Sequence, residues 1–303
     1  MAKTTANIPQ FIPSDISKSE VQTNIKFIPP EAIGERIKLR EQAPIFKVQP
    51  WQYAVLRYDG HCFSKFTSGF RKPFDDNMKN AMQRTLMDVV DKFNPIISYV
   101  QSDEITIVLK PLYQSKEEYE KSSDKSCHIF GGKRDKLISV ITGFISARFN
   151  CHIITLIQES SYDYKPSFVN IVNSNQQHFD GRLLVYEADE NIELLNYFVW
   201  RQNDCLRNCT SSYARYIYGH KAIMHKKFYD LVEMLNKSTT KHNDISIEYK
   251  YGVFAKKQLY TKEGIDQKTN EPVKVLRSRV IVHPILVSAN PDFEYLLKNK
   301  YWD

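Results

Sequence analysis

Three acidic residues stand where apolar stretches of the chain end or turn. Asp59 follows an apolar run and precedes Gly60, and Asp103 and Glu104 separate two β-branched runs. Carboxylates that converge on one point supply the hard oxygen ligands of Mg²⁺, and two bound ions can activate an attacking hydroxyl and stabilise a leaving phosphate. Gly60 adds a backbone carbonyl and allows phosphates to approach closely. These residues predict a two-metal site for nucleotide chemistry, and ordinary turn formation at each acid is the alternative.

The elements around these acids predict how the acids meet. Residues 53–58 have the composition of a buried strand, and apolar side chains four residues apart predict a helix that begins near Asp75 and ends near Asn94. Residues 96–109 form two β-branched runs around a short polar turn, which is typical of a hairpin. Because the helix between them must fold across the sheet, we expect Asp59 and Asp103 at one sheet edge. Polymerase palms and nucleotide cyclases both fit this pattern.

A second candidate for phosphate binding is the loop that contains Gly131 and Gly132. Lys133 and Lys136 follow directly, at the start of an apolar helix predicted over residues 135–150. Backbone N–H groups and the positive end of the helix dipole can hold a triphosphate there, with the two lysines as counter-charges. The spacing differs from that of a P-loop, and a basic loop without a ligand explains the same residues equally well.

Other candidate residues have two interpretations each. Cys205 and Cys209 lie four apart on a predicted helix and can share a metal, but no partner ligand is evident, so free thiols are favoured. His61 either contacts phosphate or is simply exposed, and Asp75 either caps its helix or acts in the site. The lysines and arginines of residues 250–279 either bind RNA phosphates or form a solvated strand face.

Length and composition limit the class of protein. The chain has 303 residues with 42 Lys+Arg and 35 Asp+Glu, a formal net charge of +7, and 42% hydrophobic residues. These values are close to globular averages and argue against a fibrous or wholly disordered chain. Neither a signal segment nor an apolar stretch approaching the ~18 residues of a membrane span is evident, and the five cysteines form no CxxC pair. We therefore expect a soluble intracellular protein with reduced thiols and no membrane partner.

The order of predicted elements indicates an α+β (mixed α/β) fold. We expect a polymerase-palm or ferredoxin-like catalytic core with helical and basic β additions at its C-terminal end. Residues 1–50 hold six of the 13 prolines and predict an extended N-terminal arm. Residues 51–187 would form the catalytic core, and residues 188–303 a helical and basic strand region packed on it. Within the core, the β-branched run 151–157 predicts a strand.

Several stretches occur together in one order along the chain. They are residues 57–66 (RYDGHCFSKF), 72–75 (KPFD), 101–105 (QSDEI), 128–133 (HIFGGK), 179–182 (FDGR), 200–204 (WRQND) and 251–254 (YGVF). This ordered set resembles the tRNA-His guanylyltransferase family of polymerases, which add nucleotides in the 3′-to-5′ direction. The resemblance covers roughly residues 34–257.

The chain departs from the eukaryotic branch of that family at two places. That branch has a His-Ile-Asn-Asn tetrad where this chain has residues 206–209 (LRNC), and a His where this chain has Ser64. These features resemble the guanylyltransferase-like branch found in bacteria, archaea and some protists. The resemblance implies templated repair of 5′-truncated tRNAs in preference to obligatory guanylate addition to tRNA-His.

The resemblance also implies roles for individual residues. Asp59 and Asp103 would bind two Mg²⁺ ions with the Gly60 carbonyl, and Glu104 would be a further catalytic group, as a metal ligand or as a support of the turn. The remaining residues would bind nucleotide: the backbone of His61, Cys62, Phe63 and Ser64, the side chain of Ser102, and the phosphate-contacting Lys133 and Lys136.

The implied substrates are tRNA, ATP, GTP and other nucleoside triphosphates. ATP would activate the 5′ end of the tRNA, and the 3′-hydroxyl of an incoming nucleotide would then displace AMP or pyrophosphate. The resemblance implies a homotetramer, and we expect it in the cytoplasm, with the mitochondrion as the alternative. Three other functions stay open: single guanylate addition to tRNA-His, a nucleotide cyclase, and RNA binding without catalysis.

Overall fold

The computed structural model describes residues 46–266, 268, 271–289 and 297–302. Its strands are β1 (Gln52–Gly60), β2 (Ile97–Gln101), β3 (Glu104–Leu109), β4 (Phe179–Glu187), β5 (Val253–Ile265), β6 (Pro272–His283) and β7 (Tyr301–Trp302). Its helices are α2 (Phe63–Thr67), α3 (Asp76–Phe93), α4 (Lys116–Lys121), α5 (Arg134–Gln158), α6 (Pro166–Asn173), α7 (Asn191–Tyr218), α8 (His220–Ile223), α9 (Phe228–Asn236) and α10 (Ile247–Tyr251). Short 3₁₀ turns lie at η1 (Ile129–Gly132), η2 (His242–Asp244) and η3 (Val287–Ala289).

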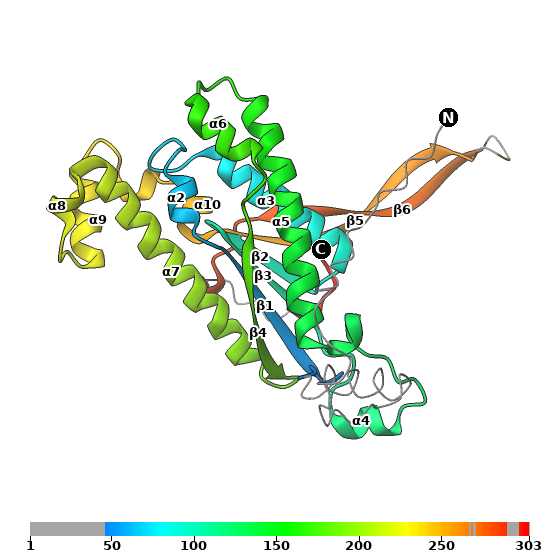
Figure 1. The fold of residues 1–303 in the computed structure, drawn as a ribbon. Helices are drawn as coiled ribbons and strands as arrows, with labels where there is room; N and C mark the ends of the chain where they lie inside the picture. Colours follow the sequence, from blue (N-terminus) through cyan, green and yellow to red (C-terminus); the bar gives the residue numbers. More distant parts are fainter. Residues whose placement is uncertain (1–45, 267, 269–270, 290–296, 303) are drawn as a thin grey trace, which may run out of the picture. The chain divides into compact units, whose positions relative to one another are not determined.

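The described strands form one sheet in the order β4-β1-β3-β2-β5-β6, and β7 pairs with β5 (Figure 1). The first part of the chain runs β1-α3-β2-β3-α5-β4, and its strands pair antiparallel in the order β4-β1-β3-β2. This is the split βαβ arrangement of ferredoxin-like folds. The α+β class with a ferredoxin-like core, predicted from the sequence, is therefore confirmed.

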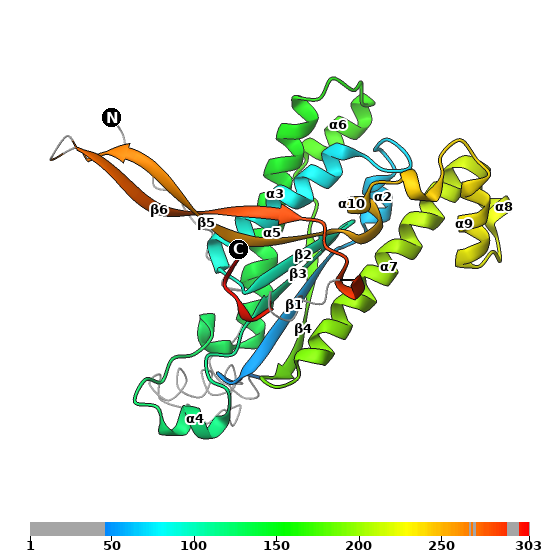
Figure 2. The ribbon, with the colours of Figure 1, turned by 180° about the vertical axis from the view of Figure 1, so that it is seen from behind.

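Helices cover both faces of the sheet (Figures 1 and 2). Successive side chains of a strand point to opposite faces. On β1, Leu56 and Tyr58 belong to the core that α3 and α5 share with the sheet. Val55 instead packs with Leu194 and Phe198 of α7. The alternation along β1 thus contributes to two cores. The last two residues of the strand, Asp59 and Gly60, belong to neither core.

Helix α3 has the ends that its sequence predicts. Asp75 is the N-cap, and its side chain accepts a hydrogen bond from the backbone N–H of Asn77 at 2.8 Å. Asn94 ends the helix in the left-handed conformation with φ 50°. Caps of these types satisfy backbone groups that a helix end leaves unpaired. The boundaries of α3 are therefore set by local chemistry.

The β2–β3 hairpin turns through Ser102 and Asp103 alone. Gln101 pairs with Glu104 across the turn, and Ser102 has a φ of 48°. Tight two-residue hairpin turns need residues that tolerate a positive φ, because this conformation matches the twist of the flanking strands. The turn places Asp103 at the tip of the hairpin, as the sequence predicts.

The strand predicted over residues 151–157 is wrong, because this run continues helix α5. Ile153, Leu156 and Ile157 are buried with helical spacing, and Cys151 is exposed. β-branched residues favour a strand locally, but burial against the sheet outweighs that preference. By length and composition alone, α5 could also span a membrane, and 39% of its most apolar 18-residue stretch is buried inside the protein. Its apolar face lies in the core beside α3 and the sheet.

The C-terminal half adds helices and basic strands to the sheet. Helix α7 packs on the sheet face opposite α3, and β5 joins the edge at β2 through residues 253–255. Beyond that contact β5 continues antiparallel to β6 as far as Ile265. The division of the chain at residues 51 and 188 stays a prediction, and residues 1–45 of the predicted arm lie outside the described residues.

The helical spacing in α5 gives a direct test. Ile153→Ala and Leu156→Ala should each lower the free energy of unfolding by about 2–5 kcal/mol, because each removes buried methyl groups. Cys151→Ala, at an exposed position of the same helix, should change it by less than about 0.5 kcal/mol. Urea denaturation of the three variants measures this. A large effect at Cys151, together with a small one at Leu156, would contradict the helix, since a strand places residues 151 and 153 on one face.

Candidate active site

The two predicted metal-binding carboxylates lie at one end of the sheet. Asp59 is next to last in β1, and its partner across the β1–β3 ladder is Glu104, the first residue of β3. The backbone N–H of Gly60 donates to the Asp103 carbonyl at 3.0 Å, which holds the hairpin tip against the end of β1. The prediction that the fold brings Asp59 and Asp103 together is therefore confirmed.

Glycine is required at position 60 by close packing. A Cβ at this position would lie 2.4 Å from the ring of Phe63. Phe63 is buried and packs on the aromatic rings of Phe66, Phe149 and Phe179. The turn after β1 is thus pressed onto an aromatic cluster that fixes its position.

The charges of the two carboxylates oppose each other. Burial, and then the charge of Asp180 across the β1–β4 ladder, raise the pKa of Asp59 above its usual range, while arginines including Arg57 and Arg182 oppose this rise. Burial, and then the charge of Asp59, raise the pKa of Asp103. Within the described residues neither carboxylate has an ion-pair partner within 4.0 Å. Half-buried like charges of this kind favour the binding of a cation.

Glu104 has a different environment from the other two acids. Its Oε1 accepts a hydrogen bond from Arg201 Nε at 2.8 Å, and its Oε2 forms an ion pair with Arg201 Nη2 at 2.7 Å. Arg201 also binds Asp204 on the next turn of α7 at 3.0 Å. Burial raises the pKa of Glu104, and the Arg201 charge opposes this rise. This bidentate pair anchors α7 to the hairpin, which favours a supporting role for Glu104 over metal ligation; its catalytic assignment stays a prediction.

The predicted nucleotide-binding turn lies directly after the carboxylate end of β1. His61, Cys62 and Ser64 are exposed, and Cys62 has a φ of 57° where the chain enters α2. The Phe63 side chain belongs to the core, so only its backbone is available to a ligand. His61 stacks on His178, with ring centroids 5.0 Å apart. Ser102 is exposed at the hairpin tip.

The Gly131–Gly132 loop is attached near the start of β1. The backbone N–H of Val48 donates to the Gly132 carbonyl at 2.9 Å, and Lys47 and Lys133 form an isolated bridge. A Cβ on Gly132, which has a φ of 67°, would lie 2.4 Å from the Val48 carbonyl oxygen, so this contact requires glycine. The described hydrogen bonds thus tie the loop to the segment before β1, whereas Asp59 lies at the end of that strand. Phosphate binding by Lys133 and by Lys136, which is exposed on α5, stays a prediction.

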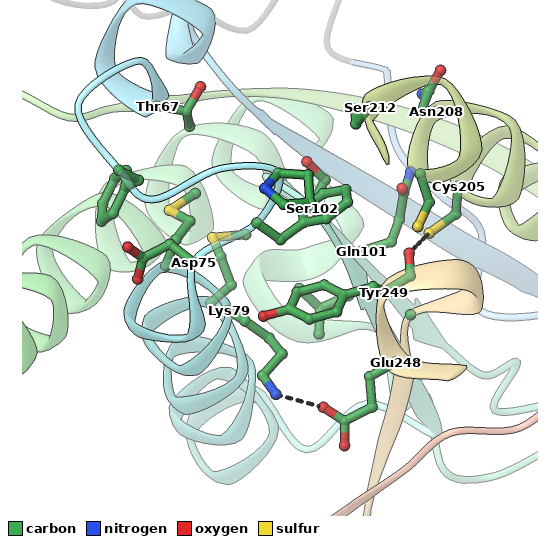
Figure 3. A pocket seen from close by; sticks show the side chains of 18 of the residues that line it. Thr67, Asp75, Lys79, Gln101, Ser102, Cys205, Asn208, Ser212, Glu248 and Tyr249 are labelled. Atoms are coloured by element: carbon green, nitrogen blue, oxygen red, sulfur yellow. Dashed lines mark hydrogen bonds and ion pairs between the residues drawn. The ribbon is translucent and has the colours of Figure 1, made fainter. Parts of the chain in front are cut away.

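A pocket of about 240 Å³ lies beside the hairpin tip (Figure 3). Its walls come from α3, α7, α10 and the turn residues Gln101 and Ser102. The Phe74 and Tyr249 rings stack with centroids 4.8 Å apart at one wall. An ion pair between Lys79 and Glu248, 3.0 Å long, joins α3 to α10. Aromatic faces with a few polar groups are typical of pockets that bind small molecules.

The two cysteines of α7 line this pocket as buried thiols. Cys205 donates to the Tyr249 carbonyl at 3.4 Å, and burial raises its pKa to about 12. Burial also raises the pKa of Cys209. Among the described side chains no three of the His, Cys, Asp or Glu type form a metal-binding group. A cation at Asp59 and Asp103 would therefore take its other ligands from backbone carbonyl, phosphate and water.

The distant contacts of two residues have no local signal in the sequence. Arg201 lies in the stretch 200–204, but its contact with Glu104 spans 97 positions and depends on how α7 crosses the sheet. Asp75 caps α3 and also joins two other segments to it. Its carboxylate accepts hydrogen bonds from the backbone N–H of Arg71 at 3.0 Å and from the Tyr164 hydroxyl at 2.7 Å. Of the two interpretations for Asp75, the structure supports the cap.

Comparison with known proteins agrees with this geometry. A family model described as tRNAHis guanylyltransferase matches residues 34–187. An uncharacterized protein of Acanthamoeba polyphaga mimivirus is 30% identical over 275 residues, covering 90% of this chain and 91% of that protein. A probable tRNA(His) guanylyltransferase of Dictyostelium discoideum is 31% identical over 173 residues, 56% of either chain.

Solved structures show the same fold. A bacterial tRNA(His) guanylyltransferase-like protein in complex with ATP has a TM-score of 0.67 and 24% identity, covering 88% of this chain and 99% of its own. A corresponding complex with GTP has a TM-score of 0.61. The family model and the curated relatives define a nucleotidyltransferase, here built on a ferredoxin-like sheet. The chain belongs to the tRNA-His guanylyltransferase family.

The buried ion pair predicts a stability defect. Arg201→Ala should lower the free energy of unfolding by about 3–5 kcal/mol, because Glu104 would stay buried with only the 4.0 Å ion pair to Arg57. Arg207→Ala, an exposed position of the same helix, is the control and should have little effect. Chemical denaturation at pH 7 measures both variants. Equal, small effects would show that the Arg201–Glu104 pair does not anchor α7.

The carboxylate repulsion predicts a pH-dependent gain. The pKa of Asp103 is raised in the folded state, so folding favours its protonated carboxyl. The stability that this protonated form contributes is fully present below the usual carboxyl pKa of 3.8, and it is lost as the pH rises through the folded-state pKa. Asp103→Asn should therefore stabilise the metal-free protein at pH 7, and this gain should shrink as the pH falls toward about 4. Thermal melts measure it. Added Mg²⁺ should raise the melting temperature of the wild-type protein and leave that of the variant unchanged; a metal-free variant less stable than the wild-type protein at pH 7 would contradict the repulsion.

Proposed function

We propose that this protein adds templated nucleotides to the 5′ end of truncated tRNA, in the 3′-to-5′ direction. The observation that carries the proposal is the Asp59–Asp103 pair, held at the sheet end beside a pocket with aromatic and polar walls. Family membership supports nucleotidyl transfer and a tRNA substrate. The templated, repair-type reaction goes beyond the family assignment and is the part to be tested.

The donor set at the sheet end fits Mg²⁺. Asp59 and Asp103 offer carboxylate oxygens that have no described ion-pair partner, and Gly60 offers a backbone carbonyl beside them. Hard cations with incomplete protein ligation and bound phosphates are typical of nucleotidyl transfer sites. Two bound Mg²⁺ ions would lower the pKa of the attacking hydroxyl and neutralise charge on the phosphates.

The pocket beside Ser102 would receive the base and ribose of a nucleoside triphosphate. Met78 and Met82 supply apolar surface, and Gln101 and Asn208 supply polar groups that can bind a base edge. The triphosphate would then point past Ser102 toward the exposed turn at residues 61–64. The bacterial relatives with ATP and GTP support binding of either purine nucleotide in this fold.

The chain's own groups would act mainly by positioning and charge. ATP would activate the 5′-phosphate of the RNA by forming an adenylylated end with release of pyrophosphate. The 3′-hydroxyl of the incoming nucleotide would then attack that 5′-phosphorus, and AMP would leave; an RNA with a 5′-triphosphate would release pyrophosphate instead. Arg57, two residues before Asp59 on β1, and Arg182 on the neighbouring strand β4 would offset negative charge that develops there.

The alternative within the family is addition of a single guanylate to tRNA-His. Asn208 matches the third residue of the eukaryotic tetrad, whereas Leu206, Arg207 and Cys209 differ from it. Of these three, Cys209 lines the pocket and Arg207 pairs with Asp204 outside it. One departure from the tetrad thus falls where the nucleotide would bind, which supports a different use of the same site. A catalytically silent RNA-binding protein is disfavoured, because it would have no use for an unpaired carboxylate pair.

We keep two further expectations as proposals. The homotetramer rests on the family resemblance alone, and the cytoplasmic location, with the mitochondrion as the alternative, rests on composition alone. Sedimentation and cell fractionation would test them directly.

Templated extension is tested with a tRNA transcript that lacks its first nucleotide and carries a labelled 5′-phosphate. With ATP, all four nucleoside triphosphates and Mg²⁺, the wild-type protein should restore the base-paired end. Asp59→Ala and Asp103→Ala should reduce the rate at least about 100-fold, since each removes several kcal/mol of charge stabilisation. The exposed Asp189→Ala variant is the control and should retain activity. A single G added to full-length tRNA-His, without repair, would favour the alternative; no product on either RNA would overturn the catalytic assignment.

The pocket assignment is tested by filling it. Ser212 lies on α7 and lines the pocket, so Ser212→Trp should occupy the space of the base and weaken ATP binding at least about 10-fold. Asn203→Trp places the same side chain on an exposed position of α7 and should not affect binding. Isothermal titration with ATP and Mg²⁺ measures both variants. Unchanged ATP affinity in a folded Ser212→Trp variant would place the nucleotide elsewhere.

A further inference from the structure

A groove of about 470 Å³ lies between α2 and the segment that leads into α6. Two lysines, two serines and an aromatic floor characterise its lining: Lys65, Ser68, Tyr162, Lys165, Ser167 and Phe168. Neither the carboxylate pair nor the pocket beside Ser102 includes these side chains. The groove therefore needs an explanation of its own.

The groove and the nucleotide pocket are separated by one stretch of chain. Residues 65–72 contribute to the lining of both, and Phe70 lines both cavities. Arg71 lines the pocket, and its guanidinium also lies over the ring of Tyr162, 5.1 Å from the centroid, at the groove. Because α2 starts shortly after Gly60, this shared wall is connected directly to the carboxylate end of β1.

The groove is built by specific packing. Asp75 links the two sides of the groove. Its carboxylate accepts a hydrogen bond from the Arg71 backbone N–H on one side, at 3.0 Å, and one from the Tyr164 hydroxyl on the other, at 2.7 Å. A Cβ on Gly69 would lie 2.1 Å from the Phe168 ring, so the loop and α6 are in direct contact. Phe66 and Phe70 both pack on Phe168. The aromatic floor is thus fixed before any ligand binds.

The exposed groups of the groove suit a polyanion that carries bases. Lys65 and Lys165 are exposed at its rim, and Asp163 is the one acidic residue among its lining residues. Tyr162 is 45% exposed despite its size. Basic side chains that follow a backbone, together with aromatic rings on which bases stack, are the features of single-strand binding sites.

We propose that this groove binds a short single-stranded RNA segment that adjoins the duplex end on which the site acts. Lys65 and Lys165 contact its phosphates, and the Tyr162 ring stacks on one base. A duplex does not serve, because its bases are already stacked and their faces are not available to Tyr162. The inference rests on the proposed function, in that the RNA is the substrate whose 5′ end is extended.

The test compares two RNAs with the same fluorescein-labelled hairpin stem, one blunt and one with a 3′ overhang of about four nucleotides, in line with the shorter single-strand sites. Fluorescence anisotropy without nucleotides or Mg²⁺ gives the affinity. The wild-type protein should bind the overhanging RNA about 10-fold more tightly, since one base stacked on an aromatic ring contributes ~1–3 kcal/mol. Tyr162→Ala and the Lys65→Ala/Lys165→Ala double variant should bring its affinity down to that of the blunt RNA.

Two controls separate binding from folding and from general charge. Tyr162→Phe keeps the ring and should keep the preference for the overhang. The Lys116→Ala/Lys121→Ala double variant removes two exposed lysines from α4 and should leave the preference unchanged. The slope of log K against log salt concentration should become shallower in the Lys65→Ala/Lys165→Ala variant, by about 0.7 for each phosphate contact that is lost. This change should occur with the overhanging RNA and not with the blunt RNA.

Each other outcome overturns the inference. Equal wild-type affinity for the two RNAs, or an equal loss on both in the groove variants, would show that the groove does not read a single strand. Extension of the truncated tRNA by wild-type protein, run in parallel, keeps the proposals distinct. If extension proceeds without any overhang effect, only the groove inference fails; if RNA is neither bound nor extended, the proposed function fails as well.

Discussion

The antiparallel pairing of β1 with β3 forces two carboxylates, Asp59 and Asp103, to one end of the sheet, and the rest of the structure depends on tolerating that charge. Asp180 on β4, which pairs with Asp59 in the β1–β4 ladder, adds a third negative group. Burial raises the pKa of both carboxylates, the charge of Asp180 adds to the rise at Asp59, and the charge of Asp59 adds to the rise at Asp103, so the charged site opposes folding. A protein keeps such an arrangement where its chemistry requires it, because strain and unfavourable charge concentrate at functional sites.

Stability at this end of the sheet comes from groups that do not face the substrate. Arg201 satisfies both oxygens of Glu104 and fixes α7 on the hairpin, while the aromatic cluster around Phe63 fixes the turn after β1. Rigid elements hold positioned groups more accurately than loops, which matters where the reaction depends on placing a hydroxyl and a phosphate. The same anchoring places Asn208 and Cys209 of α7 in the wall of the pocket.

Residues 65–72 form a wall between two cavities. One side faces the pocket next to Ser102, and the other faces the groove with Tyr162. A single buried carboxylate, Asp75, holds this wall to α3 and to the segment before α6. With both cavities occupied as proposed, this one element would position the RNA strand and the nucleotide.

The sequence by itself determined the elements whose signals are local. The strand that ends at Asp59, the caps of α3 at Asp75 and Asn94, and the hairpin tip at Asp103 all follow from periodicity, capping and turn chemistry between near neighbours. Such signals also explain the error at residues 151–157, where β-branched side chains favour a strand but the buried stripe of α5 decides for a helix. Only the tertiary structure decided which distant residues meet. The Arg201–Glu104 pair, the pocket between α3, α7 and α10, and the groove beside α2 each join segments far apart in the chain. Their partners are chosen by the packing of helices on the sheet, a property that no short stretch of sequence contains.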